Sequence, residues 1–238
     1  MHKVIKEINS DLLNLKVHRV AKGIYSVVIP DAYERCMLFM RAQEYYETPL
    51  KEFNGKTFDL FEFMNAYRKK FGSKVTCDYT KHWAGFNVPS ESIEKCYKQL
   101  CQMDNQKYMT VYDWEMLVIL KAIRQHQPKG KFYLIGVDSE RSGIMKHELA
   151  HAFYYTNMDY KAEMMSAIVT NMTEDCRNKF NHALKLLGYE EKVYMDETQA
   201  FLSTGLHVTM NRVPRVKTLS KIFSKIYKQY YNELHKTK

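Results

Sequence analysis

The sequence predicts a helix-rich α+β fold, and two features of the chain indicate it. Short stretches with strand character occur only in the first 140 of the 238 residues. In the remainder, apolar residues recur at the three- and four-residue spacing of a helix face. No internal repeat or low-complexity linker is visible, so the sequence marks no clean domain boundary. Strands in one part of a chain and helices in the rest are typical of α+β proteins.

The first 130 residues mix both kinds of element. The run GIYSVVI at 23–29 is followed by Pro30, which predicts a strand that ends at the proline. Apolar spacing and capping residues predict helices, and alternating aromatic residues predict one extended segment. These helices cover 31–46, 57–71, 90–103 and 111–126, and the extended segment covers 74–88. We expect 1–130 to be an N-terminal α/β region of the same globule, although no motif indicates its role.

Residues 131–137, KFYLIGV, form the strongest strand candidate because the run is short, apolar and rich in aromatic and β-branched side chains. Asp138, Ser139 and Ser142 can cap the helix that follows it, and this helix should break near Asn157. Three more helices are predicted, over 159–187, 196–207 and 218–234. We therefore expect a core at 131–211 and a separate C-terminal helix within 212–238.

Composition excludes several classes of protein. Hydrophobic residues make up 45% of the chain, enough to bury a substantial core. No apolar run approaches the roughly 18 residues that cross a bilayer. The N-terminus mixes charge into every turn and lacks the apolar stretch of a secretory signal, so we expect a cytoplasmic protein. The five cysteines are odd in number and form no C-x-x-C pair, which favours reduced thiols.

The positive charge of the chain is concentrated near its C-terminus. The net charge is 36 − 27 = +9, and residues 212–238 contribute 8 − 1 = +7 of it. Lysines recur at helical spacing on one face there, at Lys217, Lys221, Lys225 and Lys228. An apolar stripe opposes them, at Leu219, Ile222, Phe223, Ile226 and Tyr230. The pattern predicts an amphipathic helix docked through its stripe with its lysines in solvent. The alternative is contact with nucleic acid or an anionic membrane.

A metal-binding motif lies in the helix that follows the strand at 131–137. Residues 147–151 read HELAH, with His147 and His151 four residues apart. On a helix these side chains project from one face, where both imidazoles can bind one ion. Glu148 lies about 100° around the helix, beside the open position of such an ion rather than among its ligands. Two structural histidines on a core helix are the alternative interpretation.

The motif and its apolar surroundings resemble the H-E-x-x-H signature of the zincin metallopeptidases. The resemblance implies that His147 and His151 are two ligands of a single Zn²⁺ and that Glu148 is the catalytic glutamate. It also implies a zincin-like core with a small sheet before the active-site helix. In that family the edge of a preceding strand pairs with the substrate backbone, a role that would fall to residues 131–137.

The third ligand distinguishes the branches of this family, and the common spacings fail here. The metzincin continuation would need glycine at Tyr154 and histidine at Asn157. The short gluzincin spacing reaches Thr170 or Asn171, and neither is acidic.

The sequence DETQA at 196–200 resembles the third-ligand helix of gluzincins with longer spacers, including the lethal-factor-type toxin peptidases. This resemblance makes Glu197, 197 − 151 = 46 residues after the second histidine, the third ligand. It also makes Ala200 the small residue that lets the two helices approach. Glu163 and Glu174 remain alternatives. Asp196 and Glu197 could instead only favour a helix N-terminus through its dipole.

These residues lead to two hypotheses about function. In the first, the protein is a zinc metallopeptidase acting on a protein or peptide, with Glu148 accepting a proton from the attacking water. An oxyanion donor is then needed, and Tyr194 is favoured because it lies one turn before the third ligand. The other candidates for this donor are Tyr154, Tyr155, Tyr189 and His207. In the second hypothesis, the zincin-like core is structural or inactive, and the basic C-terminal helix binds nucleic acid or an anionic surface.

Overall fold

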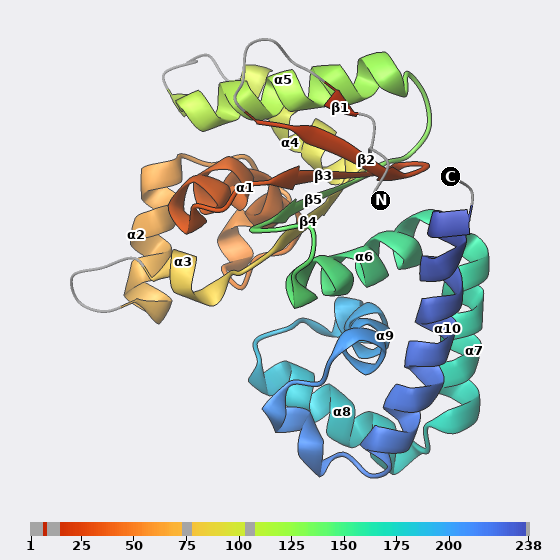
Figure 1. Cartoon of the computed structure of the whole chain (residues 1–238). Helices are drawn as coiled ribbons and strands as arrows, with labels where there is room; N and C mark the ends of the chain where they lie inside the picture. Colours follow the sequence, from red (N-terminus) through yellow and green to blue (C-terminus); the bar gives the residue numbers. More distant parts are fainter. Residues whose placement is uncertain (1–6, 9–14, 73–77, 103–107, 237–238) are drawn as a thin grey trace. The chain divides into compact units, whose positions relative to one another are not determined.

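The computed structural model describes residues 7–8, 15–72, 78–102 and 108–236 (Figure 1). The chain divides into two compact units, residues 1–142 and residues 143–238. Every strand of the described residues lies in the first unit, and their regular elements in the second unit are all helical. This confirms the predicted helix-rich α+β class. The division comes after the strand at 131–137, which the sequence analysis had grouped with the motif helix.

The sheet of the first unit has five strands in the order β1-β2-β3-β5-β4. Their bounds are β1 (Glu7–Ile8), β2 (Val17–Ala21), β3 (Ile24–Val28), β4 (Phe86–Pro89) and β5 (Tyr133–Val137). Strands β3 and β5 are parallel, and the other neighbouring pairs are antiparallel. The turn between β2 and β3 contains Gly23 at a φ of 75°, a conformation that glycine adopts without steric cost. Strand β5 is completely buried.

Strand β5 does not have the free edge that the sequence analysis expected. One side of it pairs with β3, where Ile24 faces Tyr133, and the other pairs with β4, where Phe86 faces Gly136. Both rows of backbone hydrogen-bonding groups are therefore occupied within the sheet. The expectation that residues 131–137 pair with a substrate backbone is wrong, because an internal strand has no edge to offer.

Four of the five described helices of the first unit follow the predicted ones closely, and the short α3 was not predicted. The five helices are α1 (Ala32–Tyr46), α2 (Leu60–Phe71), α3 (Tyr79–His82), α4 (Ser90–Gln102) and α5 (Val111–His126), with a 3₁₀ turn at Lys51–Phe53. Helix α2 begins three residues later than predicted because the side chain of Asp59 caps it by accepting from the backbone N–H of Glu62. Thr110 and Asp113 form a complete capping box at the start of α5.

The extended segment predicted at 74–88 is only partly correct. Residues 86–89 form β4, but residues 79–82 form the short helix α3, and residues 73–77 lie outside the described part of the chain. The helical turn places Tyr79 in the core, where it is 1% exposed and its hydroxyl donates to Glu44. Burial of this aromatic ring thus overrides the alternating pattern.

A buried ion pair crosses the core of the first unit. The guanidinium of Arg41 on α1 contacts the carboxylate of Asp113 on α5 at 2.8 Å, and both side chains are almost completely buried. Arg41 also donates to the backbone oxygens of Phe58 and Tyr108. The ion pair and these backbone bonds satisfy the buried charge of Arg41 and connect α1 to α5.

The second unit is built from helices alone. They are α6 (Gly143–Thr156), α7 (Met158–Asn171), α8 (Glu174–Leu186), α9 (Tyr194–Thr204) and α10 (Val216–Lys236), with 3₁₀ turns at Glu191–Val193 and Val208–Arg212. The single helix predicted over 159–187 is wrong. Its apolar periodicity continues through a break at Met172, where the Thr173 hydroxyl accepts from the backbone N–H of Cys176 and starts α8.

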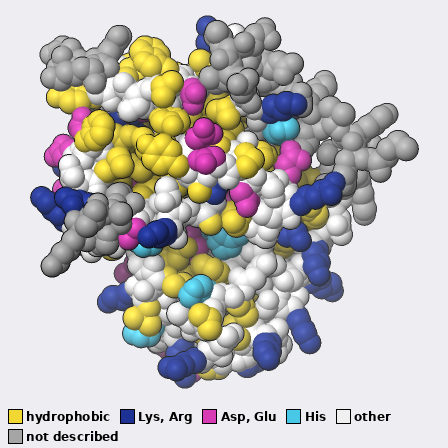
Figure 2. Space-filling view, turned by 60° about the vertical axis from the view of Figure 1, so that its left-hand side comes forward, with side chains coloured by type: hydrophobic (Ala, Val, Ile, Leu, Met, Phe, Trp, Pro, Cys, Tyr) yellow, Lys and Arg dark blue, Asp and Glu magenta, His cyan; other side chains and the backbone are white. Residues whose placement is uncertain are grey.

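Helix α10 docks through part of its predicted stripe: Leu219 and Phe223 are buried, whereas Ile222, Ile226 and Tyr230 are half-buried. It packs against α7 and α9, and Leu219, Phe223 and Tyr227 on its inner face are at most 5% exposed. Its four lysines, at 217, 221, 225 and 228, are exposed. The lower part of Figure 2 shows Lys and Arg side chains over the surface of this unit. The basic segment is therefore an integral part of the second unit.

From its composition, the chain is expected to lack a membrane-spanning segment and to carry reduced cysteines. The described helices include none that is long and apolar enough to cross a bilayer. The described cysteines are free thiols. Three of them are buried, at Cys36, Cys96 and Cys176, and Cys101 is exposed.

Candidate metal centre

The two motif histidines lie on successive turns of α6. This helix is buried along most of its length, including Leu149, Ala150 and Phe153. It ends where the backbone N–H of Asn157 bonds to Phe153 and the Asn157 side chain caps α7. The histidines therefore project from a fixed helix. The His151 side chain is 3% exposed and that of His147 is 21% exposed, so His147 marks the side of the centre nearer to solvent.

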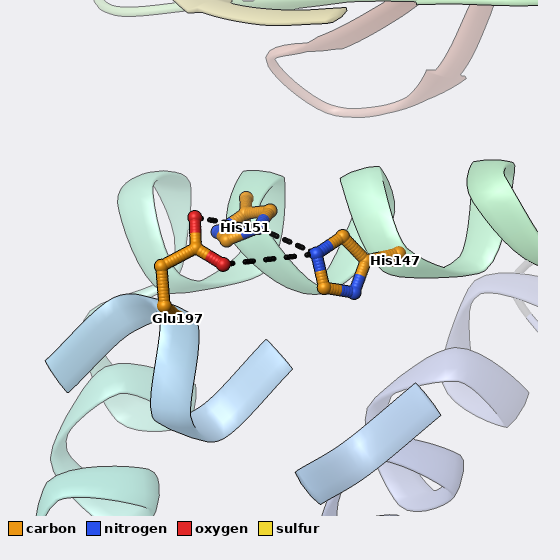
Figure 3. Close-up of side chains that lie close together, drawn as sticks. All are labelled: His147, His151 and Glu197. Atoms are coloured by element: carbon orange, nitrogen blue, oxygen red, sulfur yellow. Dashed lines mark hydrogen bonds and ion pairs between the residues drawn. The ribbon is translucent and has the colours of Figure 1, made fainter. Parts of the chain in front are cut away.

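Glu197 reaches the same point from the first turn of α9, which packs against α6 (Figure 3). Its carboxylate oxygens lie 3.6 Å from Nε2 of His151 and 3.8 Å from Nε2 of His147. The two Nε2 atoms lie 3.2 Å apart. Figure 3 shows the three side chains turned toward one another. The structure thus brings together the two motif histidines and the acid predicted 46 residues beyond them.

The spacing of these atoms fits a tetrahedral ion. Zinc binds nitrogen and carboxylate oxygen at about 2.1 Å, so two ligand atoms of a tetrahedral site are about 3.4 Å apart. The two Nε2 atoms, 3.2 Å apart, lie close to that value, and the two Glu197 oxygens lie at 3.6 Å (Oε1 to His151) and 3.8 Å (Oε2 to His147) from them. Each of the three residues offers one ligand atom within 4.8 Å of the others, so together they could hold a metal ion.

Hydrogen bonds behind the histidines orient both rings. Nδ1 of His151 lies 3.0 Å from an Asp196 carboxylate oxygen, and Nδ1 of His147 lies 3.2 Å from the Thr204 hydroxyl oxygen. The Thr204 hydroxyl donates its hydrogen to the backbone oxygen of Ala200. The Thr204 hydroxyl oxygen therefore accepts the hydrogen bond from Nδ1 of His147. Nδ1 of each ring then carries a hydrogen, and the Nε2 atoms of both rings lie on the side of Glu197. Metal-binding histidines are commonly oriented in this way.

The electrostatics of the centre favour a positive charge within it. Burial lowers the pKa of His147 to about 3, and the neighbouring His151 adds to the effect. Burial also acts to lower the pKa of His151, but the carboxylates of Asp196, Glu197 and Glu148 outweigh it and raise that pKa to about 10. Three carboxylates around two imidazoles leave excess negative charge that a bound cation would neutralise.

Glu148 lies in the centre without belonging to the ligand group. Its side chain is buried at 6% exposure, and its charge is among those that raise the pKa of His151. The described residues contain one group of three metal-ligating side chains, and Glu148 is not a member of it. Glu148 is therefore a buried acid near His151 that stands outside the group of His147, His151 and Glu197.

The alternative third ligands lie elsewhere in the second unit. The carboxylate of Glu163 on α7 accepts a hydrogen bond from the Tyr230 hydroxyl at 3.1 Å. Glu174 is exposed in the first turn of α8. In the described part of the chain, neither belongs to the group formed by His147, His151 and Glu197.

The predicted oxyanion donors occupy different places. Tyr194 lines a cavity of about 170 Å³ between α7, α8 and α9, together with Ile168 and Arg177. Tyr154 on α6 has its pKa raised to about 12 by burial and by the charge of Asp196, which places it in electrostatic reach of the centre. The ring of Tyr189 packs on Phe201.

The two other candidates for the oxyanion donor are His207 and Tyr155. His207 is exposed and caps the 3₁₀ turn at Val208–Arg212. Tyr155 follows Tyr154 on α6 and is half-buried.

Sequence reasoning missed the residues behind the ligands. Asp196 was considered only as a helix-terminus charge, and nothing in the sequence distinguishes that role from a hydrogen bond to His151. Thr204 lies seven residues after Glu197, two helical turns along the same face, and this spacing could have identified it. The buried Gln199, which binds Asp196, carries no sequence signal.

Comparison with protein-family models, curated protein sequences and solved structures found no match for this chain. The functional interpretation therefore depends on the geometry of His147, His151 and Glu197, on the acid beside them, and on the sequence motif.

Proposed function

We propose that the protein is a zinc-dependent metallopeptidase that holds one Zn²⁺ through His147, His151 and Glu197. The observation that carries this proposal is the convergence of two histidines and one glutamate at ligand spacing. Catalytic zinc is typically held by three protein ligands, two histidines and a glutamate among them, with a fourth position left open. Two histidines with one carboxylate favour zinc over magnesium or calcium, which prefer oxygen ligands.

Glu148 is the group that moves protons in this proposal. A bound zinc ion would act as a Lewis acid toward water and the substrate carbonyl. The Glu148 carboxylate accepts a proton from the water that attacks the peptide carbon. As the C–N bond breaks, it delivers that proton to the departing amine nitrogen. Its burial near His151 keeps it in place for both transfers.

The oxyanion that forms at the carbonyl carbon needs a hydrogen-bond donor from the chain. Tyr194 was favoured from its sequence position, and Tyr154 gains support from its place near Asp196. With a pKa of about 12, the Tyr154 hydroxyl keeps its proton at neutral pH and can donate a hydrogen bond to an oxyanion. Tyr154→Phe and Tyr194→Phe distinguish the two, because only loss of the true donor lowers kcat by about a hundredfold or more.

The peptidase proposal is tested by Glu148→Gln. The variant should bind zinc as the wild type does and lose at least about a hundredfold in hydrolysis rate on a library of unstructured peptides. Glu174→Gln, an exposed acid of the same unit, is the matched control and should retain both properties. Wild-type rates from zinc-loaded Glu148→Gln would remove this residue from the mechanism.

A second candidate function is binding of an anionic surface through α10. Lys217, Lys221, Lys225 and Lys228 are exposed along this 21-residue helix. Such a cationic face could attract nucleic acid or anionic lipid without catalysis. Nucleic-acid affinity that falls steeply with salt, in a protein that binds no zinc, would favour this function over the peptidase.

A further inference from the structure

A chain of hydrogen bonds leads from the metal centre behind His151 into the buried interior of the second unit. The same oxygen of Asp196, Oδ1, lies 3.0 Å from Nδ1 of His151 and accepts from Nε2 of Gln199 at 2.9 Å. The Asp196 side chain is 22% exposed, so one of its oxygens is held by two buried partners while the residue remains near the surface. This shared oxygen fixes where the carboxylate can lie relative to the imidazole.

The orientation of the Gln199 amide is set by its surroundings. Gln199 is completely buried, and its nitrogen also donates to the backbone oxygen of Ala150 at 3.3 Å. Both neighbours of this nitrogen, the Asp196 carboxylate and the Ala150 carbonyl, only accept hydrogen bonds. A flipped amide would place its oxygen against both acceptors, so only one orientation is favourable.

Tyr160 completes the chain from α7. Its hydroxyl donates to the amide oxygen of Gln199 at 2.7 Å, and the residue is completely buried. Burial raises the pKa of Tyr160, so its hydroxyl remains a donor. Its ring packs on Phe153 of α6 and Tyr230 of α10, at 5.5 and 5.1 Å between centroids. The outer end of the chain is thus fixed by aromatic packing from two other helices.

We propose that Asp196 is a positioning residue for the metal centre, held by Gln199 and Tyr160 so that it fixes the ring and tautomer of His151. The inference rests on the proposed function, because it assigns Asp196 a role toward the zinc that His151 would bind. The carboxylate accepts the Nδ1 hydrogen of His151, which leaves Nε2 free as the ligand atom and makes it more basic. Tyr160 acts on His151 indirectly, because its hydroxyl orients the Gln199 amide and that amide holds the Asp196 carboxylate.

Zinc affinity, measured by competition with a chromophoric chelator, tests the proposal. Asp196→Asn should weaken zinc binding by about 10- to 100-fold. The matched control is Asp175→Asn, an exposed acid on α8 of the same unit, which should leave the affinity unchanged. If Asp196→Asn binds zinc within twofold of the wild type, Asp196 does not position the centre.

Tyr160→Phe tests the chain itself, since it removes one hydroxyl and keeps the packed ring. Alone it should weaken zinc binding several-fold, and in the Asp196→Asn background it should add little because it acts through the same carboxylate. Fully additive losses would show that Tyr160 acts by another route. In the zinc-loaded protein, the Nδ1 hydrogen of His151, followed by ¹⁵N NMR, should exchange faster with water in both variants. Unchanged exchange would contradict the proposal even if a variant were less stable.

Failure of the inference and failure of the peptidase proposal give different results. A wild type that binds no zinc contradicts both. A wild type that binds zinc as tightly as Asp196→Asn contradicts the inference alone. A zinc-loaded wild type that hydrolyses no peptide, while Asp196→Asn loses affinity as expected, contradicts the peptidase and supports the inference.

Discussion

Glu44→Gln should make the protein more stable at neutral pH and have little effect in acid. Glu44 lies on α1 in the core of the first unit, is 0% exposed, and accepts from the Tyr79 hydroxyl at 2.8 Å. Burial raises its pKa from 4.5 to about 8, although hydrogen bonds from Thr48 and Tyr79 offset part of the effect. The folded protein therefore keeps this carboxyl neutral through a pH range in which the unfolded chain ionises it.

The sign and size of the expected change in unfolding free energy follow from the linkage between proton binding and folding. The stability that depends on neutral Glu44 is fully present below pH 4.5 and is lost as the pH rises toward 8, at about 1.4 kcal/mol per pH unit. The interval between 4.5 and about 8 gives an upper value of about 5 kcal/mol. Glutamine stays neutral throughout, so the advantage of Glu44→Gln should grow across this range.

Urea unfolding of wild type and variant at several pH values between 4 and 8 measures this difference directly. Glu52→Gln is the matched control, because Glu52 is an exposed acid of the same unit. The unfolding free energy of this control should change with pH as that of the wild type does. A Glu44→Gln advantage that does not change with pH would refute the reasoning, since linkage requires a slope.

Three further substitutions test the packing of the two units by urea unfolding. Phe223→Ala should cost about 3–5 kcal/mol because this ring is 0% exposed where α10 docks, and a cost below about 1 kcal/mol would mean that the helix is not docked. Asp113→Asn should cost about 3–5 kcal/mol by leaving the Arg41 charge buried without its partner, and a neutral effect would contradict the buried ion pair. Gly136→Ala should cost about 1–3 kcal/mol because its new methyl group would overlap the Phe39 ring, and an unchanged unfolding curve would show that the ring moves aside freely.

Much of the fold could be predicted because local signals and tertiary packing agree. Helix α5 has both a capping box and an apolar face, and Leu219 and Phe223 of the predicted stripe lie on the buried face of α10. Prediction failed where a single side chain decides the backbone. The Thr173 hydroxyl divides one periodic stretch into α7 and α8, and the burial of Tyr79 turns an alternating stretch into a helix. Sequence periodicity carries no information about either event.

The ligand group was predictable to the extent that it depends on local spacing. Two residues that are four positions apart lie on the same face of any α-helix. The motif alone therefore brings the side chains of His147 and His151 together. The choice of Glu197 came from a resemblance, and the structure groups this residue with the histidines while Glu163 and Glu174 lie elsewhere. The edge-strand expectation failed because sheet order is a non-local property that the sequence of one strand does not contain.

The most direct test of the metal centre is zinc binding by the wild type and by Glu197→Gln, measured by metal analysis after dialysis and by chelator competition. We predict one zinc ion per wild-type chain and a large loss of affinity in Glu197→Gln, with Glu191→Gln, an exposed acid in the turn before α9, binding as the wild type does. A wild type that retains no zinc, or a Glu197→Gln variant that binds it equally well, would contradict the account.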